Sequence, residues 1–157
     1  MAIKAIPDTS PRVIPILVCR DVEREVEFCQ QVLAAQVAVR RPGPDGQTVH
    51  AALALGDARI ILQAEFPQLA SRAPEPDGTS PIVVLVYVED VDRALDNATA
   101  LGGSVLLPAQ NQFWGDRTAR VMDSCGPVWT LASRIEDTTE DQRQDRWDDI
   151  RKNTAGD

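Results

Sequence analysis

The pattern of hydrophobic and polar positions takes the same course twice along the chain. Apolar, β-branched runs at 13–18 and 82–88 each predict a strand. Each run leads to an aspartate, Asp21 or Asp90, which is suited to begin a helix by accepting hydrogen bonds from backbone N–H groups. The helices predicted at 21–34 and 90–101 each carry an apolar stripe at helical spacing, formed by Val22, Val26, Cys29 and Leu33 in the first and by Val91, Leu95, Ala98 and Leu101 in the second.

The two halves also match in sequence. Asp-Val-Glu-Arg at 21–24 lies over Asp-Val-Asp-Arg at 90–93, an offset of 69 positions (90 minus 21), and Ile16 then lies over Leu85. Turn signals at 44–46, 56–57 and 124–126 divide the rest of each half into hairpin strands. An internal repeat of this kind fixes the architecture, because each copy is one structural unit. Each half therefore predicts the order strand, helix, three strands.

The predicted fold class is α+β, with two βαβββ modules forming a curled mixed sheet around a cleft. The modules cover about 13–65 and 81–134, and a linker with three prolines and a glycine covers 66–80. A C-terminal helix is predicted at about 137–152, with Trp147 and Ile150 suited to dock on the body of the protein. The whole chain, 1–157, is interpreted as a single domain, which its length allows.

Composition and charge narrow the classes of partner. The net charge is −8 and no basic stripe exists to neutralise phosphates, which argues against nucleic acid. No run of 18 apolar residues predicts a membrane span, and the N-terminal stretch does not resemble a signal peptide, so a cytoplasmic location is expected. Cys19, Cys29 and Cys125 show no metal-type spacing and are interpreted as reduced thiols.

Candidate binding chemistry is concentrated in "NQFWGDRTARVMDSCGPVWTL", residues 111–131. The chain has three Trp, three Phe and one Tyr, yet Phe113, Trp114 and Trp129 all fall in this stretch, beside Asp116 and Arg117. Such rings can pack in a core, or they can line a pocket in which a planar molecule stacks. Both interpretations stay open on the sequence alone.

The repeat and its motifs resemble those of the vicinal oxygen chelate superfamily, which includes glyoxalase I, bleomycin-resistance proteins and extradiol dioxygenases. The resemblance covers about 12–143. Within it "VYVEDVDRAL", "NQFWGDRTARVMDSCGPVW" and "IEDTTEDQR" are similar to the PhnB-like, bleomycin-resistance-like branch, although Cys125 and Pro127 replace a Phe and a His that are common there. The resemblance implies a ligand bound between the modules and a homodimer, often with a module exchanged between chains. Unpaired strand edges favour the same partner.

The superfamily's enzymes hold a divalent metal with four side chains, two from each module. The resemblance and the repeat place these positions at Ile16, Ile61, Leu85 and Thr130. Three of them have no donor atom, and a lone threonine hydroxyl is a poor ligand for zinc, nickel or iron. We therefore expect no metal ligands and no cofactor, which argues against glyoxalase-type isomerisation and extradiol cleavage, since both need a Lewis acid.

The function predicted from these observations is metal-free binding or sequestration of an aromatic or planar natural product, as in antibiotic resistance. The alternative is an enzyme of the superfamily (a lyase, isomerase or dioxygenase) that uses side-chain acids and bases among His50, Glu65, Tyr87 and Asp116, or a metal at other ligands. No catalytic residue is assigned. The predicted ligand-binding residues are Ile16, Leu85, Tyr87, Phe113, Trp114, Asp116, Arg117 and Trp129.

Overall fold

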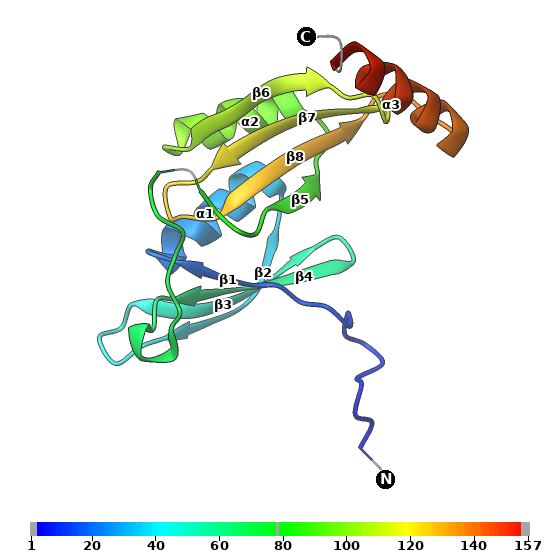
Figure 1. Ribbon diagram of the computed structural model, residues 1–157. Helices are drawn as coiled ribbons and strands as arrows, with labels where there is room; N and C mark the ends of the chain where they lie inside the picture. The colour runs from blue at the N-terminus through cyan, green and yellow to red at the C-terminus, as the bar shows by residue number, and fades with distance from the viewer. Residues whose placement is uncertain (1–2, 78, 155–157) are drawn as a thin grey trace.

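The structure, a computed structural model, describes residues 3–77 and 79–154, which form two four-stranded mixed sheets (Figure 1). The first sheet contains β1 (Ile16–Cys19), β2 (Gln36–Pro42), β3 (Thr48–Leu55) and β4 (Ala58–Ala64), in the order β1-β4-β3-β2. The second contains β5 (Val84–Tyr87), β6 (Ser104–Asn111), β7 (Asp116–Met122) and β8 (Val128–Arg134), in the order β5-β8-β7-β6. Both sheets pair their first strand in parallel with their last. The predicted α+β fold of two βαβββ modules is therefore confirmed, and the sheets are not closed.

The helices begin where the sequence predicts. In α1 (Val22–Leu33) the Asp21 side chain accepts a hydrogen bond from the Arg24 backbone N–H at 3.1 Å. In α2 (Val91–Ala100) Asp90 accepts one from Arg93 at 3.0 Å. Because these carboxylates satisfy N–H groups that lack intrahelical partners, they fix both helix starts. A short 3-10 turn, η1 (Pro67–Leu69), lies between the modules.

The core lies between the two sheets and the helices that cover them. Alternate strand residues, such as Leu53 and Leu62 in the first sheet and Leu131 in the second, point toward the helices and are fully buried. The two helices also contact each other, with the Asn97 side-chain amide donating to the Gln31 carbonyl at 3.4 Å. One continuous hydrophobic cluster therefore joins both modules through α1 and α2.

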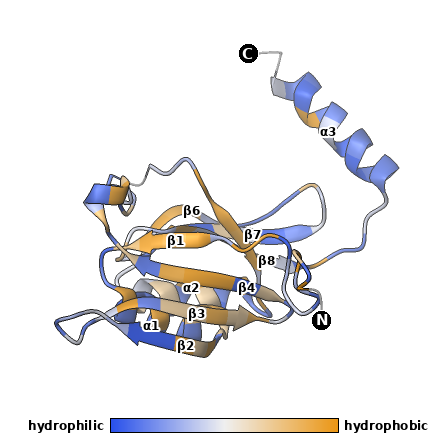
Figure 2. Ribbon diagram, turned by 90° about the horizontal axis from the view of Figure 1, so that it is seen from below, coloured by the Kyte–Doolittle hydropathy of each residue, from blue (hydrophilic) through white to orange (hydrophobic). Residues whose placement is uncertain are grey.

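The C-terminal helix, α3 (Glu140–Thr154), projects from the body of the protein and is mostly hydrophilic (Figure 2). Trp147 docks on Phe113, with ring centroids 5.4 Å apart, as the sequence led us to expect. Both residues that we expected to dock remain partly exposed, Trp147 at 43% and Ile150 at 42%. The hydrophobic spacing needed for a buried face is too sparse in this helix, so polar contacts near its first turns attach it. None of the described helices is long and apolar enough to cross a bilayer.

Each sheet has a second face, turned away from α1 and α2, on which apolar side chains stay exposed. Ile16 in the first sheet and Leu85, Tyr87 and Leu107 in the second are each about half exposed or more, at 55%, 48%, 55% and 53%. When exposed apolar side chains form a patch on one face of a sheet, that face is more often a binding surface than one that simply faces solvent. We call this side of each sheet its open face.

Candidate functional site on the open face of the second sheet

Strand register sets which side chains share the open face of the second sheet. Leu85 in β5 pairs with Thr130 in β8, Thr130 pairs with Arg120 in β7, and Arg120 pairs with Leu107 in β6. Directly paired residues point to the same side of a sheet, so these four side chains cross the open face in one row. A hollow of about 380 Å³ lies over them, lined also by Val83 and Trp114.

Arg120 forms the polar floor of this hollow. Its Nε donates a hydrogen bond to Thr130 Oγ1 at 3.2 Å, and Thr130 itself is almost fully buried. In the part of the chain that the structure describes, Arg120 has no carboxylate within ion-pair distance. A guanidinium carries five N–H donors, of which the contact with Thr130 uses one. The remaining donors can serve a ligand.

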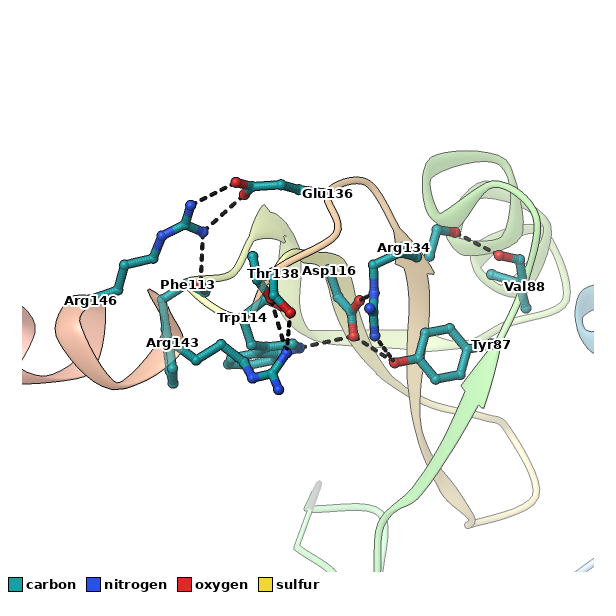
Figure 3. Close-up of polar contacts among 11 residues, drawn as sticks. Tyr87, Val88, Phe113, Trp114, Asp116, Arg134, Glu136, Thr138, Arg143 and Arg146 are labelled. Carbon is teal, nitrogen blue, oxygen red and sulfur yellow. Dashed lines mark hydrogen bonds and ion pairs between the residues drawn. The ribbon is translucent and has the colours of Figure 1, made fainter. Parts of the chain in front are cut away.

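Asp116 lies at the end of the same face and holds two aromatic side chains (Figure 3). Its Oδ2 accepts hydrogen bonds from the Tyr87 hydroxyl at 2.7 Å and from Trp114 Nε1 at 2.9 Å, and its Oδ1 accepts one from Arg134 Nε at 2.6 Å. The carboxyl is 1% exposed. Burial acts to raise the pKa of Asp116, but the three donors and the Arg134 charge hold it below its usual range.

The network satisfies Asp116 without a ligand. An ionised carboxylate that already has three donors and a cationic partner gains little from a second cation. Asp116 is therefore best described as a positioning residue, because it orients Trp114 and Tyr87 at the rim of the hollow. Arg120, by contrast, carries a positive charge on this face without a carboxylate partner among the residues described.

Gly115 gives the Trp114 loop its sharp turn. It has a φ of 96°, and a Cβ there would lie 2.4 Å from the Glu136 carbonyl oxygen. Only glycine accommodates both the left-handed backbone and that close approach. The Gly115 carbonyl accepts N–H groups of Ile135 and Glu136, each at 3.0 Å. The segment after β8 therefore lies directly against the loop.

The segment before α3, together with α3 itself, holds the same loop from the other side (Figure 3). Thr138 Oγ1 donates to the Trp114 carbonyl at 2.8 Å, and Arg146 donates to the Phe113 carbonyl at 3.0 Å. Arg146 also forms a two-pronged ion pair with Glu136. The rings of Phe113 and Trp114 meet edge to face, with centroids 5.0 Å apart. The aromatic loop is thus fixed in place before any ligand arrives.

The structure brings together several of the residues that the sequence indicated. Leu85 and Trp114 line the hollow, Tyr87 lies on the same face beside them, and Asp116 lies beneath both rings. Phe113 supports Trp114 and contacts α3 instead of facing the hollow. Strand alternation predicts that Leu85 and Tyr87, two positions apart, share a face, and the register agrees.

Other predicted residues lie elsewhere. Arg117 points to the helix side of the sheet and pairs with Asp92 of α2 at 2.8 Å, so it does not form an ion pair with Asp116. Trp129 is 0% exposed and stacks on Phe28 with centroids 6.0 Å apart, which places it in the core. Ile16 lies on the first sheet and lines a separate hollow of about 220 Å³.

The four positions that correspond to the metal ligands of the superfamily's enzymes form two cross-strand pairs. Ile16 pairs with Ile61, and Leu85 pairs with Thr130. Three hydrocarbon side chains supply no lone pair, and the Thr130 hydroxyl already accepts a hydrogen bond from the Arg120 cation. A guanidinium next to the position also repels a metal ion. This donor set does not fit a divalent metal on the open faces.

Of the four candidate acids and bases, the structure joins two. Tyr87 and Asp116 are hydrogen-bonded, whereas His50 lies on the first sheet with Nδ1 3.4 Å from an Arg41 nitrogen. Glu65 accepts the Ala73 N–H at 2.9 Å and so ties down the chain after β4. Arg120, Thr130 and Arg134 were not among the predicted ligand-binding residues, although the stretch 111–131 already offered Arg120 as a side chain that could orient the polar edge of a ligand. Asp116 and Arg120 are four positions apart in β7, and strand alternation would have indicated that their side chains share a face.

Two βαβββ modules, each with one helix-covered face and one open face, define the structural class of the protein. Residues 12–131 match the Glyoxalase/Bleomycin resistance protein/Dioxygenase superfamily, and the chain belongs to that family. An uncharacterized protein of Mycobacterium tuberculosis (strain ATCC 25618 / H37Rv) is 32% identical over 140 residues, covering 87% of this chain and 82% of that protein. An uncharacterized protein of Mycobacterium bovis is also 32% identical over 140 residues, covering 87% of this chain and 92% of that protein.

Solved structures show the same fold. TioX from Micromonospora sp. ML1 is 25% identical with a TM-score of 0.59, over 80% of this chain and 100% of that chain. The fosfomycin resistance protein FosX from Mesorhizobium loti is 15% identical with a TM-score of 0.58, over 85% of this chain and 97% of that chain. At the 15% identity of FosX, the likeness concerns the fold alone. One fold can host many unrelated functions.

Proposed function

We propose that this protein binds a planar or aromatic small molecule that carries an anionic or carbonyl group, and that it does so without a metal in the ligand-binding hollow. The observation that carries the proposal is the Arg120 guanidinium, held by Thr130 at the floor of a hollow with apolar walls. The role fits sequestration of a natural product, as in antibiotic resistance, and a position in the PhnB-like branch of the family. Three buried, reduced thiols suit a cytoplasmic location.

The physical basis is the pairing of one charge with apolar walls. Leu85, Leu107 and the Trp114 ring offer surface on which a flat molecule can pack. A hydrogen bond from a guanidinium to a carboxylate contributes about 1.5–3 kcal/mol, more than a neutral bond, and two parallel N–H donors also fix orientation. The walls therefore favour planar ligands in general, and Arg120 selects those with an acceptor at one edge.

Binding can be tested by the fluorescence of the protein with 2-naphthoate, a planar carboxylate, and naphthalene-2-methylamine, a cation of similar shape. Trp114 lines the hollow, so we expect its emission to change when 2-naphthoate enters. Arg120→Gln should weaken 2-naphthoate binding by at least 10-fold, which corresponds to about 1.4 kcal/mol. Arg117→Gln is the matched control, because it removes the same charge from the opposite face. Equal losses in the two variants, or tighter binding of the amine, would contradict the proposal.

The alternative function is an enzyme whose acid or base is the Tyr87–Asp116 pair. It is favoured by one observation, the 2.7 Å hydrogen bond that orients the Tyr87 hydroxyl on the open face. The two functions differ in the fate of the ligand. Chromatography after incubation should recover a sequestered ligand unchanged, whereas an enzyme would convert it and would lose that conversion in Tyr87→Phe.

We also propose that the protein acts as a homodimer in which a second copy covers the open faces, with or without exchange of a module between the chains. Exposed Ile16 and Leu107 support this, since isolated apolar faces of this size favour association. Proteins of this family commonly form dimers. Sedimentation equilibrium at micromolar concentration should give twice the mass of one chain, and a single-chain mass would rule the dimer out. Under this proposal the two modules, about 13–65 and 81–134, remain one folded domain.

A further inference from the structure

A second cluster of chemically active side chains lies on the other side of the second sheet, inside the core. Glu25 extends from α1, and Asp123 and Cys125 come from the turn between β7 and β8. All three residues are buried, and one ligand atom from each lies within 4.8 Å of the other two. The cluster therefore joins a helix of the first module to a turn of the second. It is separate from the hollow that holds Arg120.

Glu25 is the least explained member of the cluster. It is 0% exposed, and its Oε2 has no hydrogen-bond partner in the part of the chain that the structure describes. The Cys29 thiol donates a hydrogen bond to Oε1 at 3.8 Å. A buried carboxyl oxygen without a partner costs about 1–3 kcal/mol, and more if it is charged. Burial, followed by the charge of Asp123, raises the pKa of Glu25 well above its usual range.

The internal repeat shows that the fold does not require this carboxyl. At the offset that superposes the two helix caps, Glu25 corresponds to Ala94 of α2, which is buried in the same way. The turns differ as well. Two residues join β3 to β4 (56–57), but five join β7 to β8 (123–127). The longer turn brings Asp123 and Cys125 toward Glu25 of α1. The equivalent position of α2 holds only Ala94.

Asp123 is held in a fixed orientation for this role. Its Oδ1 accepts the backbone N–H groups of Cys125 at 2.7 Å and Gly126 at 3.0 Å, and its Oδ2 accepts Trp129 Nε1 at 2.6 Å. Carboxylates that ligate metals are commonly oriented by such outer hydrogen bonds. Each carboxylate oxygen has two lone pairs, so Oδ2 keeps one for a further contact.

We propose that Glu25, Asp123 and Cys125 form a buried structural site for a divalent transition metal of the zinc class. A thiolate combined with carboxylates suits Zn²⁺ or Co²⁺ better than Mg²⁺ or Ca²⁺, which prefer oxygen ligands only. The bound ion supplies the missing partner of Glu25 Oε2. It also links the two modules at a point where the Arg20 N–H already donates to the Cys125 carbonyl at 3.0 Å.

Binding at this site releases protons. Cysteine and glutamate ligate zinc-class metals as thiolate and carboxylate, so both must be deprotonated when the ion is bound. A metal ion replaces the proton on each, because a nearby cation stabilises thiolate and carboxylate together. Affinity should therefore increase with pH, with up to two protons leaving for each ion that binds.

The test uses Co²⁺ as a spectroscopic probe. Full-length protein is unfolded in urea with a chelator, then refolded with one equivalent of Co²⁺ or Zn²⁺, so that burial does not limit access. We expect one ion per chain by elemental analysis, a near-ultraviolet thiolate-to-cobalt absorption band, and a higher midpoint of thermal unfolding than without metal. Glu25→Ala, which copies Ala94, and Cys125→Ser should each weaken binding at least 100-fold. Glu23→Ala, on the exposed side of α1, should bind as the wild type does.

Two results would overturn the proposal. In the first, the wild type binds no ion, or binds an ion without showing the thiolate band, and the Glu25→Ala variant is more stable than the wild type. Glu25 and Asp123 would then be a carboxyl pair that shares a proton. The other is unchanged Co²⁺ binding in Glu25→Ala and in Cys125→Ser, which would place the ion elsewhere. If Glu25→Ala fails to fold by circular dichroism, Cys125→Ser and Glu25→Gln provide the same comparison.

Discussion

Replacing each of two tryptophans by phenylalanine should separate core from binding surface. Trp129 and Trp114 both donate their indole N–H to an aspartate, at 2.6 Å and 2.9 Å. Trp129 is fully buried, and its partner Asp123 is buried with it. Trp114 is half-buried, and its partner Asp116 keeps two other side-chain donors. The two substitutions are therefore chemically identical and differ only in surroundings.

The expected costs follow from those surroundings. At position 129 the smaller ring leaves a cavity of about 40 Å³, worth about 1 kcal/mol. The loss of the indole donor to buried Asp123 adds about 1–3 kcal/mol. Trp129→Phe should thus lower the free energy of unfolding by about 2–4 kcal/mol. Trp114→Phe should lower it by about 0.5–1 kcal/mol, because solvent and the other donors replace the lost bond.

Urea denaturation followed by far-ultraviolet circular dichroism measures both values without relying on the tryptophan signal. In the ligand assay the order should reverse, so that Trp114→Phe weakens 2-naphthoate binding while Trp129→Phe leaves it nearly unchanged. Equal stability losses, or a larger loss at 114, would refute the assignment of Trp129 to the core and of Trp114 to the hollow. The same result would remove the aromatic wall from the proposed site.

Three further outcomes are expected. The pKa of Asp116 is lowered, so the ionised carboxylate stabilises the fold above the ordinary aspartate pKa, and this contribution to the free energy of unfolding is lost as pH falls through the pKa of the folded state. Asp116→Asn should abolish that acid dependence in urea titrations. Glu25 has a raised pKa, so metal-free protein should lose stability as pH rises above the ordinary glutamate value, and Glu25→Gln should not. Arg146→Ala removes the bonds to Glu136 and to the Phe113 carbonyl, and limited proteolysis should cut α3 faster while global stability changes by less than about 0.5 kcal/mol.

The fold could be predicted because its signals are local. Asp21 and Asp90 cap helices through bonds to residues three positions on, and period-2 and period-3.6 patterns depend only on neighbouring residues. The offset between the two caps then predicted a shared architecture, which the two equal strand orders confirm.

The candidate site was less predictable, because the direction of a side chain depends on partners far along the chain. Trp114 and Trp129 are equally aromatic in sequence, but register turns Trp129 toward Phe28 while a loop turns Trp114 to the open face. Arg117 and Arg120 are three residues apart and point to opposite sides of β7. Alternation separates such positions only once the sheet, and the helix that covers one face, are known.

Local sequence signals are enough to predict the paired βαβββ architecture, its helix starts and the hydrocarbon character of three of the four family ligand positions. Where charge remains available depends on contacts between distant parts of the chain. Three cysteines without metal-type spacing gave no sign that Cys125 meets Glu25, because those residues lie 100 positions apart (125 minus 25). Packing of α1 against the β7–β8 turn brings them together, and no local pattern encodes a contact between two modules.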